Sequence, residues 1–358
     1  MQGLSKTGSD LLEALVLEIL SKLPVKSLTC FRCVCKPWSS SFQTPLFITK
    51  HLQNNLRNNN LNLLHKGFCG DSRDGVHSFS QLSTEKGQNF SVKQNFHLPF
   101  SGKGWSFLEV DGPCNGILCL ADRDKAALWN PSTREFKILP QSSVQRPPLA
   151  DSTRFRCLGF GYDSQTDDYK VVRFVVNYFE EDSDAGSRFE QNDQVELYSL
   201  RSDLWKEISY PGVNPDGSPL FNSYVNGVYY WWANGSSGHL ILSFDMVSEK
   251  FSTLPFPETL DRFYSHLLDF NGLLGAIFYQ VEMFLGFWKN GELFIESSDH
   301  ELVLFDPSTR ELKNLGIHAS KWTMQITAYV ESLVPINGRS EHDGRIICRP
   351  AGGASNCY

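Results

Sequence analysis

The sequence has little positive charge. Its 33 lysine and arginine residues are outnumbered by 40 aspartate and glutamate residues, and the net charge is −7. Such a chain offers no overall attraction to a phosphate backbone or an anionic lipid surface. We therefore expect no nucleic acid and no membrane as a partner. The 41% of hydrophobic residues predicts a globular protein.

A disulfide framework and a metal motif are missing as well. The nine cysteines are an odd number without a repeated spacing, which indicates reduced thiols and predicts a cytoplasmic location, with the nucleus as a second one. Cys30, Cys33 and Cys35 lie close together, but no second Cys or His cluster completes a tetrahedral site, so we expect buried thiols, no metal and no cofactor. Glu13 and Glu18 interrupt the first apolar run, so we expect no signal peptide.

Catalytic motifs are also absent. The sequence contains no H-E-x-x-H and no G-x-S-x-G, and its nine histidines are dispersed. The glycines of "GFG" at Gly159 and Gly161 are not followed by a helix start, so we interpret them as positions of close strand packing rather than as a phosphate loop. The sequence predicts no catalytic residue.

The N-terminal part of the chain predicts a small helical unit. Apolar residues recur at steps of three and four from Leu12 to Leu23, which is typical of an amphipathic helix. Pro24 ends this helix, because a residue before proline is pushed out of the helical region, and Ser27 and Pro37 can open two more. A unit of about forty residues rarely has a sufficient core of its own. We expect a partner to cover its remaining apolar face.

The rest of the chain repeats one pattern of aromatic residues. Four segments carry an aromatic residue followed seven positions later by a large apolar one, with turn formers such as "NPST" between them. The pairs are Trp129 and Phe136, Tyr198 and Trp205, Phe244 and Phe251, and Phe305 and Leu312. The pattern predicts a strand, a tight turn and a returning strand in each segment.

Asn-Gly pairs precede three of these segments, at Gly116, Gly227 and Gly291. Each pair is followed by a β-rich run, and the unit recurs at intervals typical of propeller blades. The sequence therefore predicts a large all-β domain, a β-propeller-like (kelch-like) array, behind the helical unit. A β-sandwich is the second interpretation.

The stretch "LLEALVLEILSKLPVKSLTCFRCVCKPW", from Leu11 to Trp38, resembles the F-box of plant proteins. The resemblance implies a three-helix F-box that docks on a Skp adaptor protein and, through it, on a cullin. It implies that Leu15, Ile19, Phe31 and Trp38 pack the unit itself. By position, the adaptor-facing residues are Leu11, Leu12, Glu13, Leu23, Pro24, Val25 and Leu28.

The segments "GPCNGILCL", "LWNPSTREFKILP", "GFGYDSQTDDYKVVRF" and "GFWKNGELFIES" resemble the F-box-associated domain, especially that of S-locus F-box and S-locus F-box-like proteins. This resemblance implies the substrate-recognition subunit of an SCF (Skp-cullin-F-box) E3 ubiquitin ligase, which is not itself an enzyme. It also suggests a pollination S-RNase, in self-incompatibility, as a client. A strand pair that the relatives carry is missing between Gln280 and Val281, which predicts an incomplete blade.

Residues 177–194 interrupt two strand patterns and carry six acidic side chains against one arginine. The segment predicts a long acidic loop, either a solvated insertion or a surface that attracts a basic client protein. In the second interpretation the client-binding residues are Tyr178, Phe179, Glu180, Glu181, Asp182 and Asp184.

These patterns divide the chain into four parts: an F-box helical domain (8–52), a connecting region with the first strands (53–104), the propeller-like domain (105–336) and a loose C-terminal tail (337–358). Two other functions stay open. One is a propeller enzyme or carbohydrate-binding protein with a helical appendage, and the other is an F-box scaffold that acts outside ubiquitin ligases.

Overall fold

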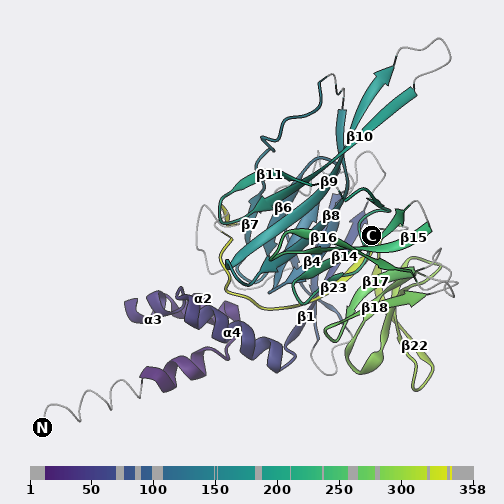
Figure 1. Cartoon of the computed structure of the whole chain (residues 1–358). Helices are drawn as coiled ribbons and strands as arrows, with labels where there is room; N and C mark the ends of the chain where they lie inside the picture. Colours follow the sequence, from purple (N-terminus) through teal and green to yellow (C-terminus); the bar gives the residue numbers. More distant parts are fainter. Residues whose placement is uncertain are drawn as a thin grey trace, which may run out of the picture.

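The computed structural model of the chain places a small helical unit beside a large domain built only of strands (Figure 1). This confirms the predicted fold class. The structure describes residues 13–69, 76–84, 90–98, 108–148, 150, 152–181, 188–209, 211–235, 238–256, 265–278, 283–320, 323–336 and 339–340.

The helical unit contains one helix whose described part covers residues 13–20, followed by α2 (Val25–Phe31), α3 (Lys36–Ser41) and α4 (Pro45–Arg57). Pro37 lies in the first turn of α3, and the Thr44 hydroxyl accepts a hydrogen bond from the amide of Phe47 at the start of α4. The helical unit therefore has a fourth helix, which extends beyond the predicted boundary at residue 52. None of the helices that the structure describes is long and apolar enough to cross a membrane.

In the described parts of the chain the strands form six antiparallel sheets, which we number as blades in chain order. Blade 1 has the order β23 (Gln325–Val330), β1 (Leu61–Cys69), β2 (Val76–Leu82), β3 (Val92–Phe96). Blade 2 contains β4 (Glu109–Cys114), β5 (Ile117–Ala121), β6 (Ala126–Asn130), β7 (Glu135–Ile138) and β24 (Arg339–Ser340). Blade 3 contains β8 (Ser152–Asp163), β9 (Asp168–Glu181), β10 (Arg188–Ser199) and β11 (Leu204–Ile208).

The other three blades follow the same antiparallel scheme. Blade 4 contains β12 (Asn214–Pro215), β13 (Tyr224–Val225), β14 (Val228–Gly235), β15 (Gly238–Asp245) and β16 (Lys250–Pro255). Blade 5 contains β17 (Ser265–Phe270) and β18 (Leu273–Phe278). Blade 6 contains β19 (Met283–Phe287), β20 (Leu293–Glu296), β21 (Glu301–Asp306) and β22 (Glu311–His318), with the short 3₁₀ helix η1 (Lys289–Gly291) between its first two strands.

The blades form a ring through one strand of each sheet. β23 contacts β4, β4 contacts β8, β8 contacts β14, β14 contacts β17, and β19 contacts β23. Between blades 5 and 6 the contact is aromatic: the ring of Phe270 lies 5.7 Å from that of Phe287. Because β23 follows all strands except the short β24 and pairs with β1, the first strand, distant segments of the chain close the ring within blade 1.

The aromatic repeat corresponds to cross-strand pairs, as predicted. Trp129 lies directly opposite Phe136, Tyr198 opposite Trp205, Phe244 opposite Phe251, and Phe305 opposite Leu312. In three of the four turns an Asn or Asp side-chain oxygen accepts hydrogen bonds from the amides two and three residues later, as Asp245 does from Val247 and Ser248 at 2.8 Å. Pairs of this kind contribute to sheet stability through direct side-chain packing.

The glycines of "GFG" lie on the innermost strand of blade 3, where another blade packs closely. A Cβ atom on Gly159 would come within 2.4 Å of the Trp231 ring, and one on Gly161 within 2.5 Å of the Tyr224 ring. Both aromatic residues belong to blade 4. The interpretation of these glycines as positions of close strand packing is confirmed.

Three expectations about the β domain need correction or comment. The ring begins before residue 105, because β1, β2 and β3 form a full blade with β23; these strands lie in the region 53–104, where the sequence predicts the first strands. The predicted loose tail contributes β24, which pairs Arg339 with Phe136. Among the described residues blade 5 has two strands while every other blade has at least four. Residues 279–282, where the sequence predicts the missing strand pair, lie outside the described residues, so the incomplete blade stays a prediction.

Candidate functional site

The helical unit buries one apolar face and exposes another. Its core consists of Leu20, Leu28, Phe42 and Phe47, with Leu23, Phe31 and Trp38 packed against it. On the first helix Leu15 is 54% exposed and Ile19 is 64% exposed. Large aliphatic side chains that are exposed next to each other on one small unit are typical of a surface that a partner protein covers.

The structure changes the set of adaptor-facing residues that the sequence predicts. Val25 and Leu28 are fully buried, so neither is accessible to an adaptor, whereas Leu15 and Ile19 lie on the surface although they were expected to pack the unit. The reason is that the first helix carries apolar residues on more than one stripe, and helical periodicity alone does not decide which stripe turns inward.

Glu13 and Pro24 are exposed and Leu23 is half-buried, while Leu11 and Leu12 lie outside the described residues. Leu15, Ile19, Leu23 and Pro24 therefore contribute accessible apolar surface around the first helix. Val34, Leu46 and Leu56 are exposed elsewhere on the helical unit.

A strap of residues 331–336, which follows β23, fastens the helical unit to the β domain. The Glu331 carboxylate accepts a hydrogen bond of 2.7 Å from the amide of Val25 at the start of α2, and the Asn55 side chain donates to the Glu331 carbonyl at 3.1 Å. On the opposite side the Asn130 side chain donates to the carbonyls of Ser332 and Val334. Burial raises the pKa of Glu331, and the Val25 amide opposes that rise.

The contacts of the strap have no signal in the sequence, because their partners are hundreds of residues apart. Leu333 packs against the apolar core of the helices, so the strap contributes to that core as well. The helical unit is thus held in one position on the β domain by hydrogen bonds and by apolar packing.

The described residues of the acidic segment belong to two paired strands, called the hairpin here, rather than to the expected loop. β9 and β10 continue their pairing to Glu181 and Arg188, which lie directly opposite each other. The segment was expected to be a loop because its acidic composition is typical of a solvated insertion. Among the residues described, β8 pairs with β9 only as far as Tyr178, so the hairpin extends beyond its blade.

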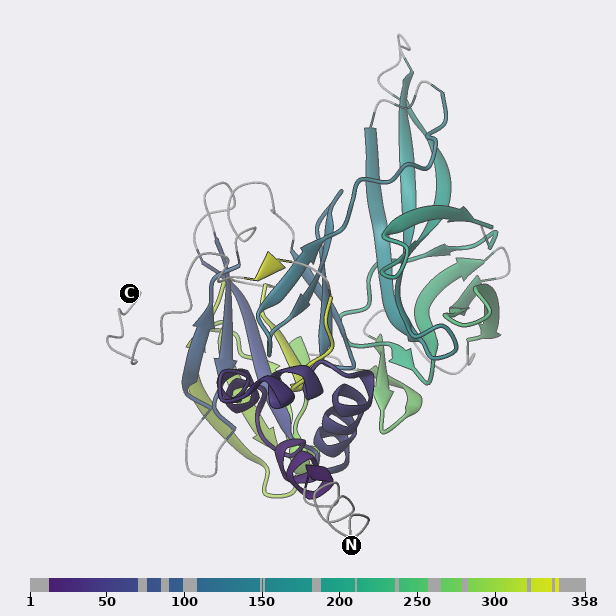
Figure 2. The same cartoon turned by 90° about the vertical axis from the view of Figure 1, so that its left-hand side faces the viewer.

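The hairpin projects from the end of the molecule that is farthest from the helices (Figures 1 and 2). Tyr178 is half-buried, and the guanidinium of Arg154 lies 5.9 Å from the centre of its ring. Phe179, Glu180 and Glu181 are in the described strand, whereas Asp182 and Asp184 lie outside the described residues. The backbone of Phe179, Glu180 and Glu181 therefore lies in the part of the hairpin that protrudes from its blade.

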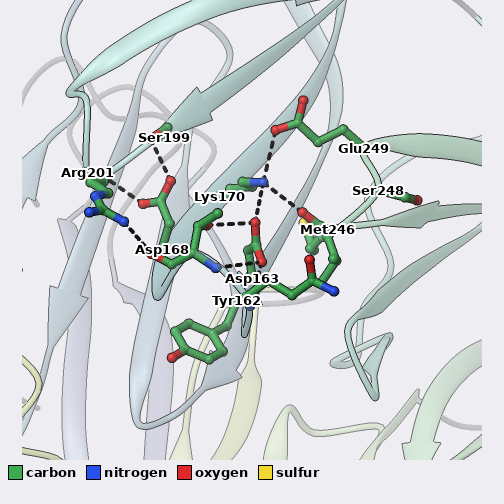
Figure 3. Close-up of polar contacts among 12 residues, drawn as sticks. Tyr162, Asp163, Asp168, Lys170, Ser199, Arg201, Met246, Ser248 and Glu249 are labelled. Carbon is green, nitrogen blue, oxygen red and sulfur yellow. Dashed lines mark hydrogen bonds and ion pairs between the residues drawn. The ribbon is translucent and has the colours of Figure 1, made fainter.

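A polar cluster joins blade 3 to blade 4 (Figure 3). The ammonium of Lys170, on β9, donates to the Asp163 carboxylate at 2.7 Å, to the Met246 carbonyl at 2.8 Å and to the Glu249 carboxylate at 2.9 Å. All three donors of the ammonium are thus used. Met246 and Glu249 belong to the turn between β15 and β16, so the cluster links two blades.

The charges of this cluster stabilise one another. Burial alone would lower the pKa of Lys170, but the hydrogen bonds to Asp163 and Glu249 raise it. Burial would raise the pKa of Asp163, yet Lys170 and Thr166 lower it to about 2. A nearby cavity of about 430 Å³ is lined by Lys170, Arg201 and Trp205 among others. Arg201 also donates to the Thr166 carbonyl, so its charge is engaged in the fold.

The cysteines and acidic residues of the described part do not form a metal centre. No group of three or more His, Cys, Asp or Glu in that part is arranged to hold an ion. Cys30 and Cys33 are exposed and Cys35 is half-buried, contrary to the expectation of buried thiols. α2 turns Leu28 rather than Cys30 toward the core, and Cys33 and Cys35 lie between α2 and α3.

Comparison with known proteins finds matches along most of the chain. The family described as "F-box domain" matches residues 9–50, and the family described as "F-box associated beta propeller domain" matches residues 67–295. An F-box/kelch-repeat protein of Arabidopsis thaliana is 32% identical over 274 residues, which cover 73% of this chain and 70% of that protein.

The F-box protein CPR1 of Arabidopsis thaliana is 30% identical over 264 residues, which cover 69% of this chain and 60% of that protein. A solved structure of a protein of unknown function from Bacteroides caccae covers 72% of this chain and 73% of its own, with 8% identity and a TM-score of 0.23. A TM-score this low carries no information about the fold.

Replacing Lys170 by Met leaves the fully buried Asp163 carboxylate without its cation and removes one of the two lysines that bind Glu249. We expect a loss of about 3 kcal/mol in the free energy of unfolding, measured by urea denaturation at pH 7. Because the folded-state pKa of Asp163 lies below its ordinary 3.8, the stabilisation by this ion pair is fully present above pH 4 and is lost as the pH falls toward 2.

The matched control is Lys206→Met. Lys206 binds the same Glu249 carboxylate, but its side chain is 58% exposed, so its loss should cost less than about 1 kcal/mol. Equal losses in the two variants would show that the buried cluster does not hold blades 3 and 4 together.

Proposed function

This chain belongs to the family of F-box proteins that carry an F-box-associated β-propeller domain, and we propose that it is the substrate-recognition subunit of an SCF E3 ubiquitin ligase. The observation that carries the proposal is the order of the two parts. A helical unit with exposed apolar side chains is fixed by residues 331–336 to a rigid β domain, whose protruding hairpin lies at the far end.

The helical unit is the proposed docking site for a Skp adaptor. Leu15, Ile19, Leu23 and Pro24 supply accessible apolar surface on and after the first helix, and Glu13 lies near them in the sequence. Covering these side chains removes apolar area from water, which is the main driving force for protein association. Leu11 and Leu12 precede the same helix and belong to the proposed site by resemblance.

In this function the chain carries out no bond chemistry of its own. It holds a client near a ubiquitin-charged conjugating enzyme, so that an encounter between two proteins becomes a high local concentration of lysine and thioester. Rigid attachment matters because a receptor that pivoted freely would spread the client over a larger volume. The strap, with bonds to Val25 and Asn55 on one side and Asn130 on the other, supports this mechanism.

For the client we propose a basic protein that contacts the tip of the β9–β10 hairpin. The support is the acidic composition of residues 177–194 and the position of the hairpin away from the helices. A pollination S-RNase is one candidate, supported only by the resemblance of the sequence to S-locus F-box proteins.

We place the complex in the cytoplasm, and also in the nucleus, on the strength of the unpaired cysteines. Imaging a fluorescent fusion in plant cells tests this location, and a signal confined to the secretory pathway contradicts it.

A scaffold role outside ubiquitin ligases is the second candidate function. Such a chain would bind the adaptor, but the amount of its client would not depend on a cullin. A propeller enzyme or carbohydrate-binding protein is the third, and it would bind a small ligand or sugar without any adaptor. Measuring client abundance in cells with and without the cullin separates the ligase subunit from the scaffold, because only the ligase function makes that abundance depend on the cullin.

The adaptor test uses the double variant Leu15→Asp plus Ile19→Asp. Both side chains are more than half exposed, so the fold should be kept, while two charges in an apolar interface should weaken adaptor binding at least tenfold. The measurement is the dissociation constant of the purified chain and a Skp adaptor by isothermal titration calorimetry.

The control for the adaptor test is Leu312→Asp, at a side chain that is 66% exposed on β22 of the β domain. It should bind the adaptor as the wild type does. Adaptor binding that survives in the double variant, with circular dichroism unchanged, would show that the docking face lies elsewhere.

The client test reverses the charge of Glu180 and Glu181 to Lys. Opposite charges speed encounter, so the association rate with a purified S-RNase should fall about tenfold at low salt, measured by surface plasmon resonance. Glu311→Lys, an exposed position on β22, is the control and should not change the rate. An unchanged rate in the hairpin variant would remove the hairpin from the client site.

A further inference from the structure

Cys30 and Cys33 are two exposed thiols at the end of α2. Cys30 belongs to the last turn of this helix, and Cys33 follows its last residue by two positions. The Cys33 amide donates a hydrogen bond of 3.1 Å to the Cys30 carbonyl, so residues 30–33 form a tight turn. Such a turn keeps its first and fourth Cα atoms within about 7 Å of each other, which is the range over which a disulfide can join two residues.

A disulfide between these two thiols requires a small movement of the backbone. On a regular helix the Cβ atoms of residues three positions apart lie about 5–6 Å from each other, whereas a disulfide needs about 4 Å. Cys33 lies outside α2, and the Cys33 and Val34 amides donate to carbonyls three rather than four positions earlier, so the regular helical ladder does not hold this end of the turn. A bond that forms against such strain is easily reduced again, which is typical of reversible disulfides.

The other thiols of the described part are less suited to this chemistry. Cys35 is half-buried at the start of α3, where its backbone is extended. Three more cysteines are buried in the β domain, and burial raises the pKa of each of these thiols, so they stay protonated and unreactive. They are Cys114, Cys119 and Cys157. Among the described cysteines, Cys30 and Cys33 are therefore the accessible pair.

The helical unit around this pair carries almost only positive charge. The sequence contains no Asp or Glu in residues 19–70, and the preceding Glu18 forms ion pairs with two lysines. Burial raises the pKa of Glu135 on β7, and the charge of Arg32, which stands between the two thiols in the sequence, opposes that rise. The charge of Arg32 is thus compensated in part by the β domain.

Two lysines near the thiols have no such carboxylate. Lys26 lies four positions before Cys30 on the same helix, which makes it a neighbour of that thiol, and Lys36 lies three positions after Cys33. Both lysines are exposed and make no ion pair within the described part of the chain. Neighbouring cations stabilise the thiolate, which is the reactive form of cysteine, and they attract an anionic reagent.

We propose that Cys30 and Cys33 form a modification site that glutathione disulfide, an anionic disulfide, oxidises to an internal disulfide. The thiolate of one cysteine attacks a sulfur of the reagent, whose S–S bond breaks and releases one glutathione thiolate. The thiolate of the other cysteine then attacks the protein sulfur of this mixed disulfide and expels the second glutathione. The chain loses two electrons and two protons, and the reagent gains them as two glutathione thiols.

This site goes beyond the proposed ligase function and does not depend on it, because no step involves an adaptor or a client. It lies on the helical unit, so its oxidation leaves the blades unchanged. In a reducing compartment such a pair is reduced at rest and becomes oxidised only when the ratio of glutathione disulfide to glutathione rises.

The test treats the full chain with glutathione disulfide or with cystamine, a cationic disulfide, at low salt and pH 7. Each rate is divided by the rate of the same reagent with dithiothreitol, a neutral dithiol. We expect the relative rate to be at least about tenfold higher with glutathione disulfide. The product should lack two hydrogen atoms in mass spectrometry, and excess dithiothreitol should restore them. Trypsin cuts after Arg32, so the Cys30–Cys33 bond should appear as two linked peptides.

Four variants assign the reaction to these residues. Cys30→Ser and Cys33→Ser should each stop at the mixed disulfide and keep one glutathione, whereas Cys35→Ser should form the internal bond as the wild type does. Lys26→Glu plus Lys36→Glu should slow the reaction with glutathione disulfide about tenfold.

The charge control is Lys250→Glu plus Lys313→Glu, at exposed positions on β16 and β22, which should leave the rate unchanged. Cystamine reacting as fast as glutathione disulfide would overturn the anionic reagent. A mixed disulfide that persists in the wild type, or a linked peptide that is lost in Cys35→Ser, would overturn the Cys30–Cys33 bond. No reaction at either cysteine would overturn the site. The peptide analysis of the wild-type chain decides the question even if a variant fails to fold.

Discussion

The antiparallel pairing of β1 with β23 is the constraint on which the rest of the structure depends. It runs from Leu61 opposite Val330 to Lys66 opposite Gln325, and it joins strands from the two ends of the β domain. Blade 1 lacks its innermost strand until β23 arrives, so the ring closes only when the chain is almost complete. Bringing such distant segments together has a large entropic cost, which the packing of the closed ring must offset. The strap of residues 331–336 follows β23 directly, and its Glu331 carboxylate accepts a hydrogen bond from the Val25 amide at the start of α2.

Much of the β domain could be predicted because its signals are local. An aromatic residue and an apolar residue seven positions apart, with a turn between them, face each other when the strands pair, as Trp129 and Phe136 do. Asn115-Gly116 and Asn226-Gly227 both have positive φ, the conformation that a two-residue hairpin turn requires. Cross-strand pairs and hairpin turns of this kind are determined by residues that are close in the sequence, so they can be predicted from one sequence without knowledge of the fold.

The features that the sequence did not predict depend on distant contacts. Which stripe of the first helix turns inward depends on α2 and α4 and on Leu333, which comes from the other end of the chain. The acidic hairpin continues as strands because β9 and β10 remain paired, although its composition is typical of a loop. The exposure of Cys30 likewise depends on the packing of Leu28 in one core with Phe42 and Phe47, which the local sequence does not determine.

Ring closure and the attachment of the helices can be read together from amide hydrogen exchange on the full chain. The account predicts that β1 and β23 exchange as slowly as β8 and β14, and that the Val25 amide, which donates to Glu331, is protected with them. Rapid exchange throughout β23 and at Val25, while β8 and β14 stay protected, would contradict it, because the ring would then be open and the helical unit loosely attached.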